Sequence, residues 1–402
     1  MKLTTRRYLL PFVLVTSLFF LWGFARSILD VANQHFRDEM NISITQSSWI
    51  QVITFLAYFV SAVPAGWYIA RCGYRRGVVT GLLLFALGAF LFIPGQQLGT
   101  FQAYIACLFI IGVGLAFLET SANPYVTELG EPETATSRLN LAQSFNGLGS
   151  MLAPALVGGF LFGGGDLSVP YLVMGCVVVG VALIFSRVKL PEVSASDDAS
   201  GDTSAGSAAS AGGKLSSYFF LGLAALLAYE VAEISINSYF VLFLTGQGYA
   251  GKVEASQLLS LALGIFMVGR FAGAWLMQRI APARVLAGCA LGSVVCMLCI
   301  LFGGDLATYA LVANFACESI MFPTIFSLSL KGLEGKAKKR ASSLLMMTPV
   351  GGCAFLFMGL IADQGLLTLP FAIPLAGFVL VLMFAVRSVS SYKLRATSYK
   401  FF

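Results

Sequence analysis

Charged residues are scarce in this sequence. Asp, Glu, Lys and Arg make up only 11% of its 402 residues, whereas 58% are hydrophobic and the mean hydropathy is +0.84. A soluble domain carries about 25% charged residues, so this chain lacks the polar surface that coats a water-soluble globule. The composition therefore excludes a cytosolic enzyme, a secreted disulfide scaffold and a nucleic-acid binder. The net charge of +6 does not change this, because the basic residues lie between apolar stretches.

Residues typical of catalytic and metal sites are also few. The chain has one histidine and neither an H-x-x-E nor a G-x-S-x-G motif. Its single C-x-x-C, Cys296 to Cys299, encloses Met297 and Leu298 in a long apolar run, which favours packing over redox or metal chemistry. We therefore expect no enzyme, no catalytic residue, no metal site and no cofactor.

Long apolar runs are what the sequence does contain. A helix needs about 20 apolar residues to cross a bilayer. Twelve runs of about this length lie near residues 8–34, 46–70, 77–95, 101–127, 138–163, 168–187, 216–244, 255–278, 283–303, 305–330, 340–362 and 366–387. The first is too long for a signal peptide and contains Arg26 and Asp30. The sequence predicts an all-α membrane protein with twelve transmembrane helices.

The basic residues predict the orientation of these helices. If the N-terminus is cytoplasmic, 21 of the 25 Lys and Arg fall in inner segments, and only Arg37 and Lys252 fall in outer loops. Cytoplasmic loops carry an excess of Lys and Arg. We therefore expect both termini in the cytoplasm and a multi-pass protein of the bacterial inner membrane.

A polar segment divides the predicted helices into six and six. Residues 191–215 are rich in Ser, Ala, Gly and Asp, so they bury too little apolar surface to fold. The expected organisation is an N-terminal six-helix bundle (1–190), a flexible cytoplasmic linker (191–215), a C-terminal six-helix bundle (216–390) and a cytoplasmic tail (391–402).

The two halves show weak internal repetition. Glu119 and Pro124 recur as Glu318 and Pro323, about 200 residues later. Because six is even, both halves enter the membrane from the same side, which makes them parallel repeats. The arrangement resembles the major facilitator superfamily, whose substrate site lies near the bilayer midplane between the halves. The turn at 66–77 resembles that superfamily's signature, with Ala70 where an Asp is usual.

Longer segments carry a closer resemblance. They are FFLWGFA at 19–25 with Asp30, FLETSANPYVT at 117–127, RLNLAQSFN at 138–146 and MFPTIFS at 321–327. These segments resemble the fucose/glucose/galactose–proton symporter family of bacterial sugar permeases, and the resemblance covers nearly the whole chain except the linker and the tail.

Two acidic residues inside the predicted helices are candidates for proton coupling. An ionisable group at membrane depth costs at least about 2.5 kcal/mol and needs a partner or a role. Asp30 lies one turn from Arg26, so it is either an ion-pair partner or a proton-binding carboxylate. Glu119 has no basic neighbour within a turn and is either a coupling residue or a structural buried carboxyl. The resemblance implies proton coupling at both, although Leu29 and Arg26 depart from the family pattern.

Other polar and aromatic residues are candidates for sugar binding. Asn140, Gln143 and Asn146 form one polar stripe, which suits either sugar hydroxyls or hydrogen bonds between helices. In the seventh helix Glu233 and Asn237 share a face. The candidate substrate-binding residues are Trp22, Phe24, Arg26, Ser27, Asn123, Asn140, Gln143, Asn146, Glu233 and Asn237.

Two further predictions concern packing. Three G-x-x-x-G pairs, at 77/81, 159/163 and 269/273, are expected to let helices approach closely. Glu318 corresponds to Glu119 in the repeat, or else forms a structural ion pair with Arg270.

The sequence thus predicts a transporter that carries a monosaccharide (a hexose, deoxyhexose or amino sugar) together with a proton by alternating access. The alternatives are sodium coupling and a non-transporting sugar sensor on the same fold. The expected partners are the sugar and the lipid bilayer, with no nucleic acid, and the protein is expected to be a monomer.

Overall fold

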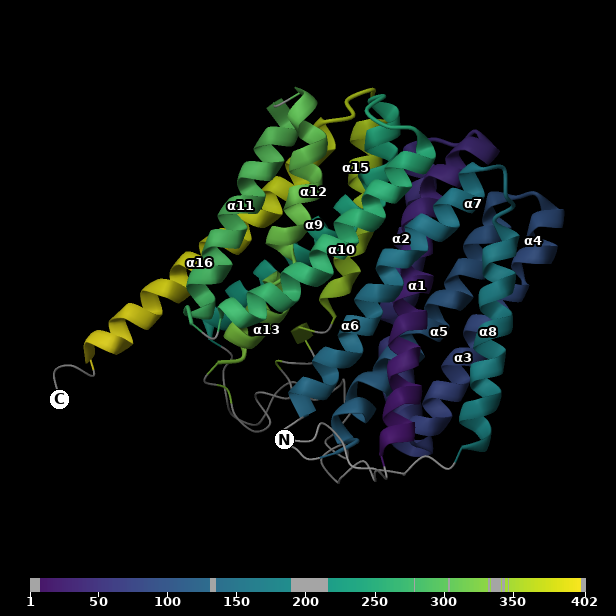
Figure 1. Cartoon of the computed structure of the whole chain (residues 1–402), viewed down its shortest axis with the longest axis horizontal. Coiled ribbons are helices and arrows are strands. Elements are labelled where there is room, and N and C mark those ends of the chain that lie inside the picture. The colour runs from purple at the N-terminus through teal and green to yellow at the C-terminus, as the bar shows by residue number, and fades with distance from the viewer. Residues whose placement is uncertain are drawn as a thin grey trace. The chain divides into compact units, whose positions relative to one another are not determined.

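The computed structural model is built from helices. It describes residues 8–130, 135–188, 216–277, 279–302, 304–331, 333, 341, 344–345 and 347–398, and helices are the only regular secondary structure in them (Figure 1). The predicted linker 191–215 lies outside these residues. The chain forms two compact units: unit 1 holds α1 to α8 and unit 2 holds α9 to α16, and residues Ser43–Ser48 at the start of α2 group with unit 2.

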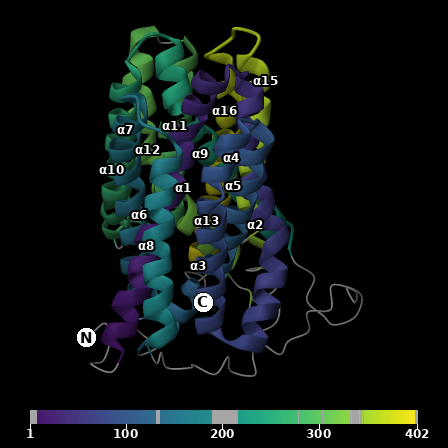
Figure 2. The same ribbon diagram turned by 90° about the vertical axis from the view of Figure 1, so that its right-hand side faces the viewer.

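In unit 1 the helices stand side by side (Figures 1 and 2). They are α1 (Leu9–Met40), α2 (Ile44–Cys72), α3 (Tyr74–Phe90), α4 (Phe92–Leu98), α5 (Phe101–Glu128), α6 (Ala135–Ala153), α7 (Gly159–Phe162) and α8 (Ser168–Arg187). A π-helical turn, Pro154–Gly158, joins α6 to α7. Helix α1 packs along α6, and α3 packs between α5 and α8.

Unit 2 is also built from packed helices. Its helices are α9 (Ser217–Gly246), α10 (Lys252–Leu276), α11 (Pro282–Phe302), α12 (Ala307–Glu318), α13 (Met321–Ser329), α15 (Phe355–Ala362) and α16 (Ala372–Ser398), with 3-10 turns at Gly304–Leu306, Thr348–Ala354 and Leu369–Phe371. Helix α16 packs against α9 and α11, and α12 packs against α10 and α11.

Eleven of the twelve predicted spans are present at full length in the described residues. The helical segments are long and apolar enough to cross a membrane, and the remaining span, predicted at 340–362, is described as a shorter apolar helix, Thr348–Ala362. Its first half is a 3-10 turn that contains Pro349, Gly351 and Gly352, which are weak helix formers. The chain is a multi-pass membrane protein.

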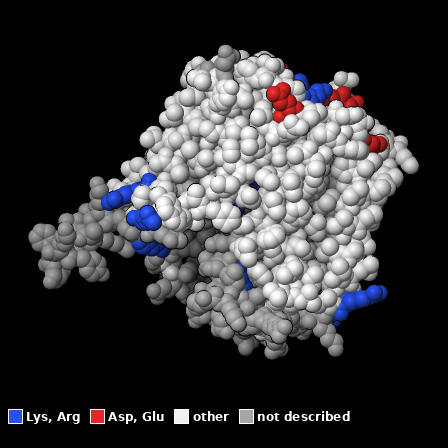
Figure 3. Space-filling view, viewed as in Figure 1, with Lys and Arg blue, Asp and Glu red and all other residues white. Residues whose placement is uncertain are grey.

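The outward faces of the helices suit contact with lipid. Large apolar side chains are exposed on several helices, such as Leu83 and Leu87 on α3, Val177 on α8, and Leu291 and Val295 on α11. The face drawn in Figure 3 accordingly has a broad area without charged side chains. Such an area is large for a soluble monomer and ordinary for a protein whose solvent is hydrocarbon.

Glycines bring α1 and α6 into backbone contact. A Cβ atom added to Gly149 would lie 2.1 Å from the carbonyl oxygen of Phe20, and one added to Gly23 would lie 2.1 Å from the carbonyl oxygen of Asn146. Any side chain at either position would therefore separate the two helices.

Two of the three G-x-x-x-G predictions are confirmed. Gly77 and Gly81 on α3 face α5, and a Cβ on Gly81 would lie 2.9 Å from the carbonyl oxygen of Gly114. A Cβ on Gly273 would lie 2.1 Å from Ile320, in the same unit. The prediction for residues 159 and 163 is wrong: a Cβ on Gly159 would meet nothing within 4 Å. The motif states only spacing, and in the described residues no other helix lies within 4 Å of a Cβ atom placed on Gly159 or Gly163.

These two environments give a matched test. Gly149→Ala should destabilise the protein by about 1–3 kcal/mol, because the atoms in its way belong to the backbone and cannot rotate aside. Gly159→Ala should leave stability unchanged or raise it slightly, since alanine is the better helix former. Thermal unfolding of both purified variants checks this, and equal midpoints would contradict the α1–α6 contact.

Candidate functional site

A polar face of α1 meets a polar face of α2 inside unit 1. Trp22 Nε1 donates a hydrogen bond to the Tyr58 hydroxyl over 2.8 Å, and Gln51 Nε2 donates to Asp30 Oδ1 over 3.2 Å. Asp30 and Gln51 are 8% and 2% exposed, whereas Trp22 and Tyr58 are half-buried. The two helices therefore hold an aromatic pair and a carboxylate–amide pair, two turns apart on α1.

Arg26 and Glu119 belong to the same polar group. The Arg26 guanidinium carbon lies 5.6 Å from the centroid of the Phe55 ring on α2, within the range of a cation–π contact. Glu119, on α5, interacts electrostatically with Arg26 and with Tyr58. Residues from α1, α2 and α5 thus converge, and both candidate coupling carboxylates lie in this group.

The predicted stripe on α6 divides its contacts between two helices. Gln143 Nε2 donates to Asn123 Oδ1 on α5 over 3.4 Å. Asn146 Nδ2 donates to the Phe19 carbonyl of α1 over 3.2 Å, and Ser150 donates to the Gly23 carbonyl. Asn146 therefore ties α6 to α1. The side chain of Asn140 lies outside the described residues.

The other candidates lie at separate places. Ser27 is buried on α1, and the Phe24 ring stacks on Phe20 with centroids 6.3 Å apart. Glu233 and Asn237 lie on α9 in unit 2, where Glu233 is half-buried and Asn237 is 7% exposed with an Oδ1 that has no hydrogen-bond partner.

Sequence reasoning missed the α2 side of the group. Gln51, Phe55 and Tyr58 follow i, i+4, i+7 spacing in an otherwise apolar helix, so they share one face. That spacing was the available signal. Phe and Tyr are common in such helices, and only the contacts to α1 distinguish these two.

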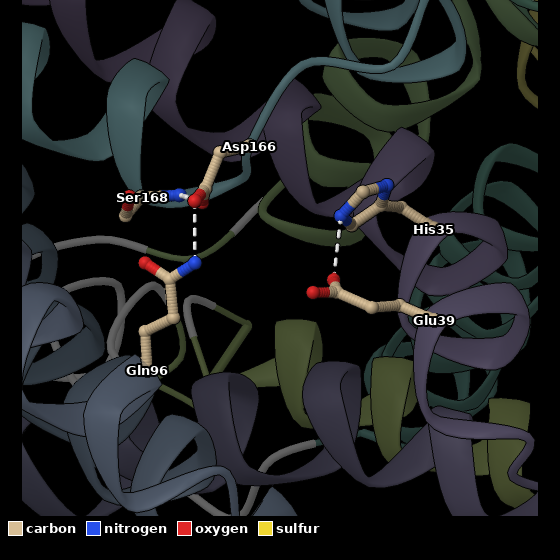
Figure 4. A network of polar contacts seen from close by, with 5 residues as sticks. All are labelled: His35, Glu39, Gln96, Asp166 and Ser168. Atoms are coloured by element: carbon tan, nitrogen blue, oxygen red, sulfur yellow. Dashed lines mark hydrogen bonds and ion pairs between the residues drawn. The ribbon is translucent and has the colours of Figure 1, made fainter.

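A second polar cluster lies at one end of unit 1 (Figure 4). His35 Nε2 lies 2.8 Å from Glu39 Oε2, one turn along α1. Separately, Asp166 accepts hydrogen bonds from the Gln96 side chain on α4 and from the Ser168 backbone N–H at the start of α8. Partial burial alone would raise the pKa of Asp166, but these hydrogen bonds outweigh it and hold the pKa below its ordinary value. The Asp166 contacts therefore join the start of α8 to α4, whereas the His35–Glu39 pair lies within α1.

The comparisons with known proteins now identify the family. Residues 15–356 match the family model described as Major Facilitator Superfamily. The chain belongs to the Major Facilitator Superfamily. This confirms the family and the all-α fold expected from the sequence, and it makes the chain a transporter-type membrane protein, not an enzyme.

Several members of this superfamily are similar over nearly the full length. The glucose/galactose transporter of Brucella abortus biovar 1 (strain 9-941) is 35% identical over 375 residues, which cover 90% of each chain. The L-fucose-proton symporter of Escherichia coli (strain K12) is 32% identical over 413 residues, which cover 95% of this chain and 93% of the relative. The crystal structure of an E. coli fucose:proton symporter superposes with a TM-score of 0.69 at 31% identity, over 95% of this chain and 99% of that one.

The hydrogen bonds to Asp166 from Gln96 and Ser168 lead us to predict that the protein loses stability as the pH falls. Because its pKa is lowered on folding, Asp166 stabilises the protein above its ordinary pKa of about 3.9, and this contribution disappears as the pH falls through the folded value. Asp166→Ala should therefore lower the free energy of unfolding by about 0.5–1 kcal/mol at neutral pH, and by less in acid.

Thermal unfolding of wild type and variant across pH measures this. Asp166→Asn is the control, since its amide oxygen can still accept a hydrogen bond but does not titrate. A difference between wild type and Asp166→Ala that stays constant down to strong acid would contradict the role of the charge.

Proposed function

We propose that this protein is a secondary active transporter that carries a monosaccharide, a hexose, deoxyhexose or amino sugar, together with a proton by alternating access. The observation that carries the proposal is the polar group of α1, α2 and α5, in which Asp30 and Glu119 lie with Trp22 and Arg26. The names of the relatives, fucose–proton symporter and glucose/galactose transporter, support the same substrate class.

The chemistry of this group suits a sugar. A pyranose ring offers an apolar face and several hydroxyls, which need an aromatic surface and groups that both donate and accept hydrogen bonds. Trp22 supplies a half-buried ring whose N–H is held by Tyr58, so the orientation of the ring is fixed before substrate arrives. Asn123, one turn after Glu119 on α5, supplies an amide, and its hydrogen-bond partner Gln143 on α6 supplies a second.

The carboxylates supply the coupling. Glu119 lies close enough to Arg26 for their charges to interact, so loss of its proton creates a charge that the guanidinium partly balances. Sugar that binds better to the protonated group raises the affinity for protons by the same factor, because linkage is reciprocal. The proton is the only coupling ion required.

The remaining expectations accompany this proposal. The distribution of Lys and Arg supports cytoplasmic termini, a bacterial inner-membrane location supports access to a proton gradient, and transport requires no more than a monomer. The division into bundles 1–190 and 216–390 joined by linker 191–215 supports two halves that move as bodies.

Glu119→Gln tests the coupling. The amide keeps the shape of the side chain but cannot release a proton, so concentrative uptake driven by a pH gradient should be lost while sugar exchange at equilibrium continues. Uptake into proteoliposomes, with L-fucose, D-glucose and D-galactose as probes, measures both activities. Glu39→Gln, at an exposed site on α1, should retain both.

The wild type gives the complementary measurement. Sugar added to proteoliposomes should make the outer medium more alkaline, and replacing sodium by choline should not change uptake. If the Glu119→Gln variant still accumulates sugar against its concentration gradient, or if uptake by the wild type requires sodium, proton coupling through this residue is overturned. Binding without any transport would instead indicate a sensor.

Tyr58→Phe tests the aromatic pair. The variant keeps the ring but removes the acceptor of the Trp22 N–H, which should weaken sugar binding about fivefold, or about 1 kcal/mol, because the loss leaves a half-buried donor unpaired. Tyr68→Phe on the same helix is the matched control, since that hydroxyl bonds Thr80 instead. Calorimetric titration with the three sugars should separate the variants, and equal affinities would remove Trp22 from the site.

A further inference from the structure

An acidic side chain in unit 2 is buried and forms no ion pair among the residues that the structure describes. Glu318, the last residue of α12, is 0% exposed. Asn314 Nδ2, one turn earlier, donates a hydrogen bond to Glu318 Oε2 over 2.8 Å. Glu318 Oε1 and Asn314 Oδ1 have no hydrogen-bond partner among the described residues.

The nearest candidate cation is engaged elsewhere. Arg270 Nε, on α10, donates to the carbonyl oxygen of Ser319 over 3.4 Å, and its guanidinium carbon lies 4.7 Å from the centroid of the Phe266 ring. Within the described part of the chain Arg270 and Glu318 form no ion pair, so of the two alternatives for Glu318 the structural ion pair with Arg270 is wrong.

Pro323 explains the position of Arg270. Proline has no N–H, so the carbonyl four residues earlier, that of Ser319, loses its helical donor. The helix is interrupted there: α12 ends at Glu318 and α13 begins at Met321. Arg270 binds the carbonyl that the proline leaves free, and its role is therefore accounted for without Glu318.

A tyrosine on α9 links Glu318 to other acids. Tyr229 is 0% exposed, and its hydroxyl has no hydrogen-bond partner among the described residues. It interacts electrostatically with Glu233, Glu318 and Glu230. Glu233, one turn along α9, is half-buried and interacts with Glu318 as well.

The titratable or charged groups around Glu318 and Tyr229 come from four helices. They are Glu230 and Glu233 on α9, Arg270 on α10, Cys296 on α11 and Cys317 on α12. Among the described residues Glu318 forms no ion pair with Arg270, whose guanidinium is bound to a backbone carbonyl. An ionised carboxylate in an apolar interior without a partner costs several kcal/mol, so the group takes up a proton instead.

We propose that Glu318, with Asn314 as its hydrogen-bond partner, forms a proton-binding site inside unit 2 that is separate from Asp30 and Glu119. The resting state carries the proton on Oε1, the oxygen that Asn314 does not bind. Ionisation breaks this O–H bond and releases the proton to water, and the carboxylate keeps the negative charge. The site goes beyond the proposed function, because it requires neither a sugar nor coupling through Glu119.

Infrared spectroscopy of the purified full-length protein without sugar tests the site directly. A protonated carboxylic acid has a carbonyl stretching band that an ionised carboxylate lacks. The wild type should show such a band at neutral pH, and Glu318→Gln should lose it. Glu39→Gln, the exposed control, should retain it. Retention of the full band in Glu318→Gln would overturn the proposal.

A second set of variants keeps the test decisive if Glu318→Gln does not fold. Asn314→Leu removes the donor on Oε2, so the band should persist at a shifted frequency. Tyr229→Phe removes a hydroxyl that makes no hydrogen bond among the described residues, so the intensity of the band should not change. An unshifted band in Asn314→Leu, or loss of the band in Tyr229→Phe, would assign the proton to another group.

These outcomes are distinguishable from failure of the proposed function. The band is measured without substrate or gradient, so a protein that carries no sugar can still show it. The band must also survive Glu119→Gln, because the two acids lie in different units. Loss of the band in that variant would move the proton to Glu119 and end the proposal for Glu318.

Discussion

Polar side chains inside these helical bundles lie among apolar ones, and this constraint governs the sites of both units. Every such group must be neutral, paired with an opposite charge or hydrogen-bonded to another part of the chain. In unit 1 the constraint is met by contacts between helices: Trp22 uses Tyr58, Asp30 uses Gln51, and Asn146 uses a backbone carbonyl of α1. These contacts join α1 to α2 and α6 while they position the groups that are candidates for chemistry.

Glu119 in unit 1 and Glu318 in unit 2 have different surroundings. Glu119 and Glu318 each lie five residues before a proline, in the fourth long span of their unit. Glu119 is close to the charge of Arg26, and its helix α5 continues through Pro124. Glu318 forms no ion pair within the described part of the chain, and its helix ends at this residue. Two acids at the same distance before a proline therefore have different partners, a guanidinium charge in unit 1 and a neutral amide in unit 2.

The sequence alone predicted those features that depend on a single helix. Apolar runs predicted the spans, because crossing a bilayer is a property of a single segment, and specific motifs predicted the family. The sequence alone did not predict contacts between side chains of different helices, because these depend on which helix lies opposite. Gln51 and Phe55 look like ordinary residues of α2 until α1 is beside them. Arg270 looked like a partner for an acid, and only the carbonyl released by Pro323 shows why it is not one. The glycine pairs at 77/81 and 159/163 have the same spacing but opposite surroundings.

The interruption after Glu318 has a mechanical consequence. No helical hydrogen bond from Pro323 crosses it, and the contact that replaces this bond comes from α10 through a single long side chain. Arg270 therefore helps to hold α13 to α12 at this break, together with the packing of α13 on α9 and α11. The same guanidinium acts electrostatically on Tyr229, so the backbone break and the surroundings of Tyr229 share one cation.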